Sequence, residues 1–243
     1  MPALAIDTAT EVLALALGDE EHVIAESGTE AGRSHLEMLL PSAQELLSSA
    51  GMAITDMEAV VVGRGPGTFS GLRVGIATAR ALVQSLEIPL YGYSTLEAMA
   101  QEIAAGVESR KASWILPMID ARRGQVFTQL FRKEGENGLK TESGVLSLDP
   151  DRLSEVLPGK SAEVRAGGNG SIAYREILED NRQLALLSLD DPANRVRASW
   201  HLGALRSAVL YQPGQLLSVL PSYVREPDAD KSALQKKREP WLK

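Results

Sequence analysis

The most informative segment of the chain reads Gly63-Arg64-Gly65-Pro66-Gly67-Thr68-Phe69-Ser70-Gly71-Leu72-Arg73. It follows an apolar run over 59–63, which is typical of a strand buried on both faces, and it precedes a helical pattern over 72–86. Glycines allow tight turns, and the first turn of a helix presents backbone donors, so the segment is either a phosphate-binding loop or a structural turn. It lacks the Lys-Ser/Thr pair of a Walker loop and the Gly-x-Gly-x-x-Gly spacing of a dinucleotide-binding loop.

Short strands and helices are predicted on both sides of this segment. Upstream, strands are expected over 3–6, 12–17 and 22–26, and the tight turns between them suggest an antiparallel meander. Downstream, a strand is expected over 89–93, and a helix capped by Ser94 is expected to run to about residue 105. The first part of the chain therefore has the order β-β-β-α-β-α-β-α.

The first of these helices is predicted to begin at Ser34. Ser34 and Glu37 fit a capping box, and apolar residues recur at helical spacing as far as Leu47. Gly51 is a plausible stop. Pro41 lies inside the pattern and is expected to kink or split the helix.

The same order of elements begins again in the second half of the chain. Asp7 ends the first strand, and Asp120 ends a strand predicted over 114–120, each before a polar turn. We therefore expect a structural repeat, although the two halves share a pattern and not a sequence. The remaining elements are expected to be a strand over 126–131, a hairpin-like loop over 133–140, a strand over 144–148, a helix over 150–157, a strand over 163–167, a helix from Ser171, a strand over 184–189 and a helix over 193–210.

Composition and charge exclude several classes of protein. The 243 residues are 44% hydrophobic and 23% charged, as in an average soluble globular protein, and no apolar run approaches the length of a membrane span. Met1 to Asp7 contain no basic region, so no signal peptide is expected. With no cysteine, the chain has no disulfide, thiolate metal site or cysteine nucleophile, which fits a cytoplasmic location. The net charge of −7 makes it a poor candidate to grip nucleic acid alone.

Candidate site residues each have a functional and a structural reading. Asp7 and Asp120 could hold a metal ion or an attacking water in a two-lobed nucleotide-binding fold, or they could simply cap turns. Arg122 and Arg123 lie next to Asp120 and could pair with it. His35 has Leu39, and not a second histidine, four residues later, so no zinc helix is indicated. No Gly-x-Ser-x-Gly nucleophile is present.

A line of small residues runs along the helix after the glycine-rich segment. Gly71, Gly75 and Ala79 recur every four residues and the line continues to Val83. Two glycines cost a helix about 1 kcal/mol each, so this line is expected to serve close packing. The neighbour is either the chain's own sheet or a helix of another chain.

Near the end of the chain, Lys236-Lys237-Arg238 is either part of a solvated tail or a basic site that attracts RNA or an acidic partner.

Several motifs together resemble the bacterial TsaB family, also called YeaZ. The resemblance spans about residues 3–225 and is densest in the first 125 residues. It is carried by Leu4-Ala5-Ile6-Asp7-Thr8-Ala9-Thr10, by Arg33-Ser34-His35 with Leu39-Leu40-Pro41, by the whole segment Gly63 to Gly75, by Ser94-Thr95-Leu96, by Ile119-Asp120-Ala121-Arg122 and by Pro221-Ser222-Tyr223-Val224-Arg225.

The resemblance implies an actin-like ATPase fold (the ASKHA superfamily) with two ribonuclease-H-like lobes. We expect a first lobe over 1–107 that carries the partner-binding helices, a second, smaller lobe over 108–225 and a polar tail over 226–243. It also implies a scaffold role in making threonylcarbamoyladenosine in tRNAs that read ANN codons. Its partners would be a catalytic paralogue, TsaD, and an ATPase, TsaE, with tRNA bound mainly through the complex and no membrane involved.

A member of this family is expected to be non-catalytic, without a cofactor or a metal. The catalytic paralogue uses a His-x-x-x-His helix, and the matching helix here has His35 but Leu39. The implied partner surface, which could also make a homodimer, comprises His35, Leu36, Leu39, Leu40, Ala43 and Leu47 with Gly71, Arg73, Gly75, Ala79 and Val83. The implied degenerate nucleotide loops comprise Asp7, Thr8, Thr10, Gly65, Gly67, Thr68, Asp120, Arg122, Gly168 and Asn169.

Two other readings stay open from the sequence. The first is an ATP-dependent enzyme of the actin-like fold, a kinase or an acyl transferase, with Asp7 and Asp120 in its cleft. It predicts magnesium-dependent ATP binding that is lost in Asp120→Ala. The second is a metallopeptidase, which the absence of a histidine pair argues against.

Overall fold

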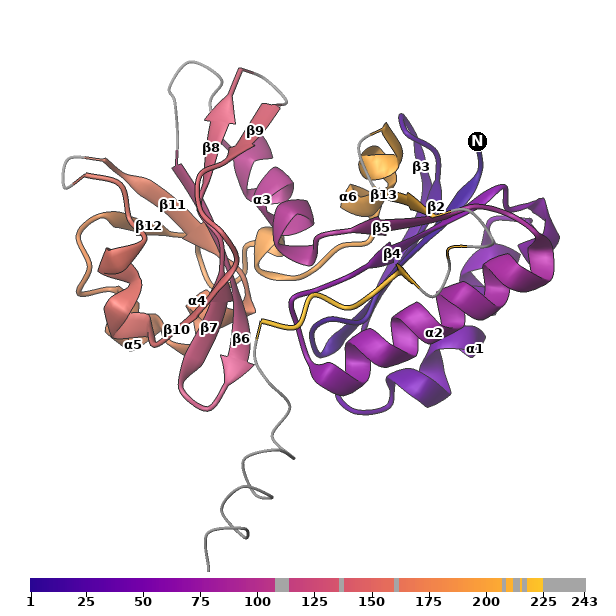
Figure 1. Ribbon diagram of the computed structural model, residues 1–243, viewed down its shortest axis with the longest axis horizontal. Coiled ribbons are helices and arrows are strands. Elements are labelled where there is room, and N and C mark those ends of the chain that lie inside the picture. Colours follow the sequence, from indigo (N-terminus) through magenta and orange to yellow (C-terminus); the bar gives the residue numbers. More distant parts are fainter. Residues whose placement is uncertain are drawn as a thin grey trace, which may run out of the picture.

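A computed structural model describes residues 1–107, 114–135, 138–159, 162–206, 209–211, 215 and 218–224. Residues 108–113, where the second lobe is expected to begin, and the tail over 226–243, with its basic trio, lie outside these ranges. The first lobe is built on a sheet of six strands (Figure 1). Its order is β13-β5-β4-β1-β2-β3, and the strands are β1 (Ala3–Asp7), β2 (Val12–Gly18), β3 (Val23–Glu30), β4 (Ala59–Gly63), β5 (Leu90–Tyr93) and β13 (Val209–Tyr211).

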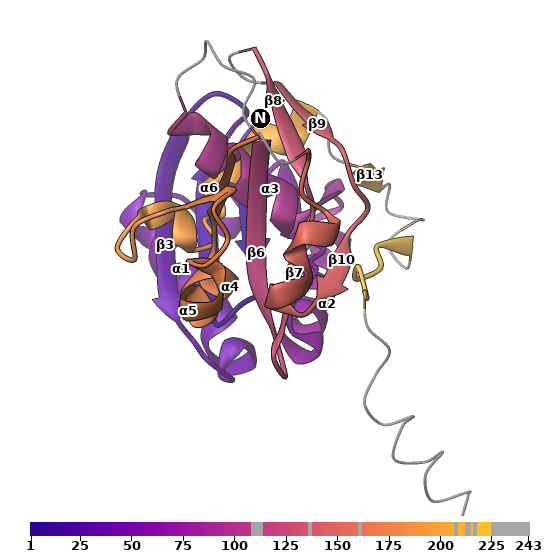
Figure 2. The ribbon, with the colours of Figure 1, turned by 90° about the vertical axis from the view of Figure 1, so that its left-hand side faces the viewer.

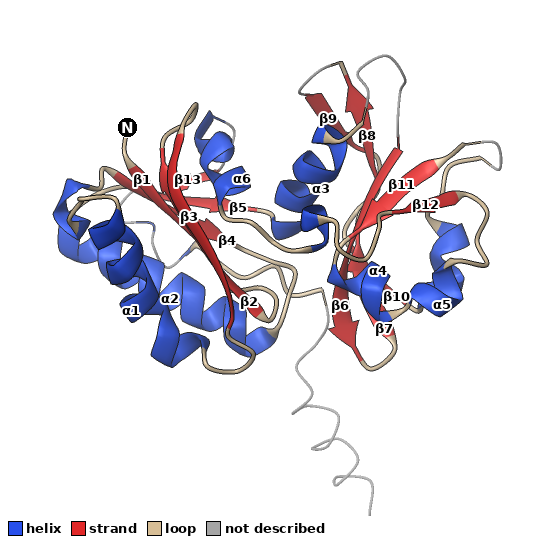
Figure 3. Cartoon of the chain, turned by 180° about the vertical axis from the view of Figure 1, so that it is seen from behind, coloured by secondary structure: helices blue, strands red, loops and turns tan. Residues whose placement is uncertain are grey.

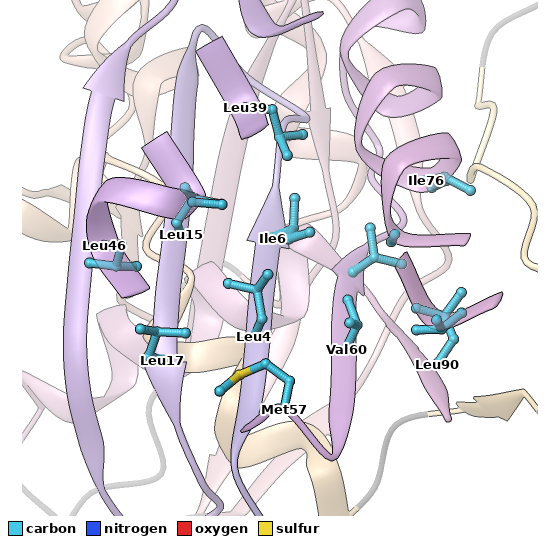
Figure 4. Packing of buried hydrophobic residues seen from close by; sticks show 14 of the residues in the cluster. Leu4, Ile6, Leu15, Leu17, Leu39, Leu46, Met57, Val60, Ile76 and Leu90 are labelled. Carbon is cyan, nitrogen blue, oxygen red and sulfur yellow. The ribbon is translucent and has the colours of Figure 1, made fainter. Parts of the chain in front are cut away.

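Side-chain alternation explains why the two faces of this sheet are covered differently. On one face, Leu4, Ile6, Leu15 and Val60 pack beneath α1 (His35–Ser49) and α2 (Phe69–Leu86), as Figure 4 shows. Successive residues of a strand point to opposite faces, so the intervening positions line the other face. These are mostly alanines, which let the short helix α6 (Ser199–Leu202) and α3 (Thr95–Ala105) approach closely: Ala3, Ala5, Ala14, Ala16 and Ala59.

The helices of the first lobe confirm the predicted order with two local corrections. The helix α1 is continuous through Pro41, so the predicted split is wrong. Ser34 is the N-cap residue but makes no side-chain cap bond, because its backbone is not extended as a capping box requires. Ser94 does cap α3, accepting a bond from the Glu97 N–H at 3.3 Å. A 3₁₀ turn, η1 (Ile54–Asp56), leads from α1 into β4.

The second lobe repeats the topology of the first. The first lobe contains the order β5-β4-β1-β2-β3, and the second lobe contains the corresponding order β12-β11-β6-β7-β10. In both lobes the first strand pairs antiparallel with the second and parallel with the fourth. The predicted repeat is therefore confirmed. These strands are β6 (Trp114–Arg122), β7 (Gln125–Thr128), β10 (Leu146–Leu148), β11 (Val164–Gly167) and β12 (Leu184–Leu186).

Smaller elements of the second lobe differ from the prediction. The strand expected over 126–131 is two strands, β7 and β8 (Phe131–Glu134). The strand β8 pairs with β9 (Gly138–Thr141) in a hairpin that projects at one end of the lobe (Figure 2). The helix expected over 150–157 is a 3₁₀ helix, η2 (Pro150–Glu155). The helix expected from Ser171 is a pair of short helices, α4 (Asn169–Ala173) and α5 (Arg175–Leu178).

The last part of the chain returns to the first lobe. The helix predicted over 193–210 is wrong: this segment forms a 3₁₀ turn, η3 (Pro192–Asn194), the helix α6, a further 3₁₀ turn, η4 (Gly203–Arg206), and β13. The open edge of β5 pairs antiparallel with β13, and this tertiary pairing overrides the helical pattern of the segment. Figure 3 shows α6 and β13 on the first lobe, although the second lobe was expected to extend to residue 225.

Candidate functional site

The carboxylate of Asp7 is buried and is held by three other groups of the chain. Its Oδ1 accepts a bond from the Ala9 N–H at 2.8 Å. Its Oδ2 accepts one from the Thr95 hydroxyl at 2.7 Å and lies 2.9 Å from Nε2 of His201. A Cβ atom at Gly63 would lie 2.0 Å from Oδ2, so the backbone closes the remaining side. The cleft carboxylate thus serves as a structural acceptor.

His201 is the member of this cluster that the sequence analysis did not single out. It lies on α6, is completely buried, and meets Tyr93 edge to face, with ring centroids 5.9 Å apart. Its Nδ1 has no hydrogen-bond partner among the described residues. No local sequence signal could have found the contact, because His201 and Asp7 stand at opposite ends of the chain and meet only when α6 packs on β1.

The glycine-rich loop is fastened to the chain's own first turn. The Thr68 N–H donates to the Ala9 carbonyl at 2.7 Å, and a Cβ atom at Gly67 would lie 2.3 Å from the same oxygen. Gly65, whose φ is +89°, donates to the Thr95 hydroxyl at 3.2 Å. These contacts correspond to the structural-turn reading of this loop.

The line of small residues on α2 faces the inside of its own lobe. A Cβ atom at Gly71 would lie 2.1 Å from the Thr8 carbonyl oxygen, and one at Gly75 would lie 2.3 Å from the Thr8 hydroxyl. Ala79 and Val83 are buried in the same core. The hypothesis that these four positions form a groove for a partner helix is therefore corrected: the turn after β1 fills the space at Gly71 and Gly75, and the core of the lobe covers Ala79 and Val83.

Asp120 is only partly buried and is also surrounded by polar groups. Its carboxylate accepts bonds from the Arg122 N–H at 2.8 Å and the Tyr174 hydroxyl at 3.0 Å, and it forms an ion pair with the Arg122 guanidinium at 3.2 Å. The predicted Arg122–Asp120 pair is confirmed. Arg122 also pairs with Glu11 of the first lobe, so it ties the two cleft turns together. Partial burial, followed by the bond to Asp120, raises the pKa of Tyr174.

The remaining predicted loop residues also make internal contacts. Asn169 accepts a bond from the Asp120 N–H at 3.0 Å. The Gly168 N–H donates to the side chain of Asn194 at 2.9 Å, a partner that the sequence analysis missed. The Thr10 hydroxyl accepts a bond from the Val12 N–H at 3.2 Å. His35 is buried, and within the described ranges no three His, Asp or Glu side chains gather as metal ligands would.

A cavity of about 660 Å³ lies away from these loops, between the turn 19–23, α3, the β8–β9 hairpin and α6. Arg197 lines it and joins two carboxylates, Glu26 on β3 at 2.8 Å and Glu102 on α3 at 3.1 Å. Burial raises the pKa of Glu102 to about 7, although the hydrogen bond from Arg197 acts against this rise.

This shift predicts a pH dependence of stability. Folded Glu102 holds its proton up to about pH 7, whereas the unfolded side chain releases it near pH 4.5. The unfolding free energy should therefore fall as the pH rises from about 4.5 to about 7, by on the order of 1–3 kcal/mol. Urea unfolding at several pH values in this range measures the slope of the unfolding free energy against pH. In Glu102→Gln the slope should become shallower, and an unchanged slope would assign it to another group.

Comparison with known proteins decides the family. The chain is 36% identical over 178 residues to the protein of Escherichia coli (strain K12) named tRNA threonylcarbamoyladenosine biosynthesis protein TsaB, covering 73% of this chain and 75% of that protein. It is 34% identical over 185 residues to the Bacillus subtilis (strain 168) protein of the same name, covering 74% of this chain and 76% of that protein. The chain belongs to the TsaB family.

Two further comparisons agree with membership of the TsaB family. A family model described as TsaD, tRNA N6-adenosine threonylcarbamoyltransferase, matches residues 22–171. The solved structure of YeaZ from Pseudomonas aeruginosa is 27% identical and superposes with a TM-score of 0.73, covering 91% of this chain and 99% of that one. A second structure, described as an uncharacterized protein with similarity to peptidase YEAZ from P. aeruginosa, is 26% identical and superposes with a TM-score of 0.75, covering 92% of this chain and 99% of that one. The TsaB-family chain therefore has the expected actin-like fold of two ribonuclease-H-like lobes. None of its described helices combines the length and the apolar character that crossing a bilayer requires.

Proposed function

We propose that this chain is a non-catalytic cytoplasmic subunit in the biosynthesis of threonylcarbamoyladenosine in tRNA. Its relatives carry the name of that biosynthesis. The observation that supports a non-catalytic role is the state of Asp7, whose two oxygens are taken up by Ala9, Thr95 and His201. A carboxylate that is completely buried and held in this way is not exposed to a substrate or a metal ion.

The surface that supports partner binding lies on α1. Leu36 and Leu40 are 74% and 54% exposed and stand one helical turn apart, so they present an apolar pair to solvent. Of the interface expected from the sequence, these two and Arg73 on α2 are exposed, whereas His35, Leu39, Ala43 and Leu47 are buried in the chain's own lobe. We propose that the part of this face around Leu36 and Leu40 on α1 packs against helices of a TsaD-like paralogue, with a TsaE-like ATPase joining the pair, and that a homodimer uses the same surface.

A double substitution tests this surface. We expect the variant Leu36→Asp/Leu40→Asp to fold normally and to lose the heterodimer, since two carboxylates replace exposed apolar side chains at a packed interface. Light scattering on a sizing column, for the chain alone and mixed with TsaD from the same organism, measures this. Leu189→Asp is the matched control, because Leu189 is 58% exposed on the second lobe. A double variant that still forms the mixed peak would refute the proposed surface.

The enzyme alternative makes the opposite prediction for ATP. A kinase or acyl transferase using Asp7 and Asp120 would bind ATP with magnesium in a saturable way, and Asp120→Ala would abolish the binding. We expect calorimetric titration of the chain alone to show no such binding. Saturable binding that disappears in Asp120→Ala would replace the scaffold proposal with the enzyme.

A further inference from the structure

An exposed aromatic pair lies at the start of α2. Phe69 and Tyr223 are 38% and 45% exposed, and they are the two aromatic residues among the large, exposed hydrophobic side chains of the described ranges. Their ring centroids are 5.1 Å apart and their planes are tilted by 32°. Two rings that meet on the surface of a chain with few aromatics form a preformed stacking surface.

A guanidinium completes this cluster. The Cζ atom of Arg73 lies 3.7 Å from the centroid of the Phe69 ring, and its Nε donates to the Tyr223 hydroxyl at 3.2 Å. No carboxylate of the described residues pairs with Arg73, whereas six other arginines in these ranges do form carboxylate pairs: Arg122, Arg132, Arg152, Arg175, Arg195 and Arg197. Among the described residues, Arg73 therefore carries a positive charge beside the rings that no carboxylate compensates.

The C-terminal segment that supplies Tyr223 is held in place by the first lobe. Arg64 donates through Nε to the Leu220 carbonyl at 3.0 Å, and its own carbonyl accepts a bond from the Ser222 N–H at 2.7 Å. Arg80 donates to the Val219 carbonyl. In Figure 1 this segment is the yellow loop that runs along α2. Because it is tied at three positions, the Tyr223 ring is positioned before any ligand arrives.

We propose that Phe69, Arg73 and Tyr223 form a contact site for single-stranded RNA. An unpaired base stacks on the exposed part of the Tyr223 ring, because the Arg73 guanidinium already lies over one face of the Phe69 ring, and a neighbouring phosphate meets the free edge of that guanidinium. Arg64 adds a second positive charge that has no carboxylate partner among the described residues. The proposal rests on the proposed role in tRNA modification, but not on the Leu36/Leu40 surface.

Two features favour RNA over a protein partner at this cluster. The two rings lie on the surface around the first turn of α2, and the Arg73 charge beside them has no carboxylate partner among the described residues. The cluster therefore offers flat rings and a cation, and not an apolar pocket for a side chain. A nucleotide satisfies both features at once, since it brings a planar base and an anion at a fixed separation. Because the net charge of the chain is −7, we expect its contact with RNA to be local. Other subunits of the complex would then hold most of the RNA phosphates.

Fluorescence anisotropy with a labelled RNA stem-loop tests the proposal on the full chain at low salt. We expect saturable binding of the stem-loop and weaker binding of a fully paired duplex of the same length. Tyr223→Leu and Phe69→Leu should each weaken stem-loop binding at least about fivefold, because leucine keeps apolar area but has no ring face. Tyr223→Phe should retain binding. Arg73→Ala should also make the affinity for the stem-loop less dependent on salt concentration. Arg152→Ala, which removes a charge from the second lobe, should leave this dependence unchanged.

The outcomes separate this proposal from the proposed function. Absence of stem-loop binding by the wild-type chain would overturn it, and so would equal affinities of wild type and the leucine variants. Both variants should still form the heterodimer on the sizing column. If they lose the heterodimer and keep RNA binding, the cluster is a protein contact, and the RNA proposal falls while the scaffold proposal stands.

Discussion

Replacing Asp7 with alanine is expected to lower the unfolding free energy by about 3–5 kcal/mol. The carboxylate is completely buried and accepts from the Ala9 N–H, the Thr95 hydroxyl and His201. Removing it leaves these groups without a partner in a site that water does not reach, and an unsatisfied buried polar group costs about 1–3 kcal/mol. The effect should appear as loss of stability and not as loss of an activity.

Urea denaturation followed by circular dichroism measures this loss. Asp7→Asn keeps the size of the side chain and one acceptor oxygen, so its loss should be smaller than that of alanine. His201→Ala should also destabilise the chain, since it removes a partner of Asp7 and leaves a cavity between α6 and β1. A change below about 1 kcal/mol in Asp7→Ala would contradict the structural role and would reopen the enzyme alternative.

Adding one methyl group at Gly71 is expected to cost about 2–3 kcal/mol. Its Cβ atom would lie 2.1 Å from the backbone oxygen of Thr8 and 2.6 Å from the Thr68 hydroxyl, so α2 would have to move away from the turn after β1. That movement also breaks the bond from the Thr8 hydroxyl to the Gly71 carbonyl, which is 2.8 Å long. The gain in helix propensity on replacing glycine, about 1 kcal/mol, offsets only part of this cost.

Ser70→Ala is the control for Gly71→Ala, because Ser70 is the adjacent, exposed residue of the same helix. Thermal unfolding should show a clear drop in Tm for Gly71→Ala and almost none for Ser70→Ala. If Gly71→Ala keeps its stability but fails to form the heterodimer, the small residues would serve a partner after all.

Local patterns predicted most of the fold. The short apolar segments of β1 and β2, the apolar run of β4 and the helical spacing of α1 and α2 can each be recognised from residues close together in sequence, and these elements appear close to the predicted bounds. The repeat of strand, Asp and turn at Asp7 and Asp120 also correctly predicted two lobes of like topology. The end of the chain was predicted wrongly, because β13 exists only through its pairing with β5.

The candidate site was predicted only in part, for a similar reason. The residues of the turns could be chosen as site candidates because Asp, Gly and Arg directly after a predicted strand have few structural roles that sequence neighbours explain. Their partners could not be selected, since His201 and Asn194 reach Asp7 and Gly168 only through tertiary packing. The spacing of Gly71 and Gly75 correctly predicted a close approach, but spacing alone could not say that the approaching group is Thr8.

The return of the C-terminal segment has a consequence for synthesis of the protein. A ribosome releases β1 to β5 long before it releases α6 and β13, so the nascent first lobe has an open sheet edge at β5 and an Asp7 that lacks His201. Open strand edges pair with other chains when they wait exposed. Between translation of residue 93 and translation of residue 211, the growing polypeptide therefore exposes a strand edge that β13 covers in the finished protein.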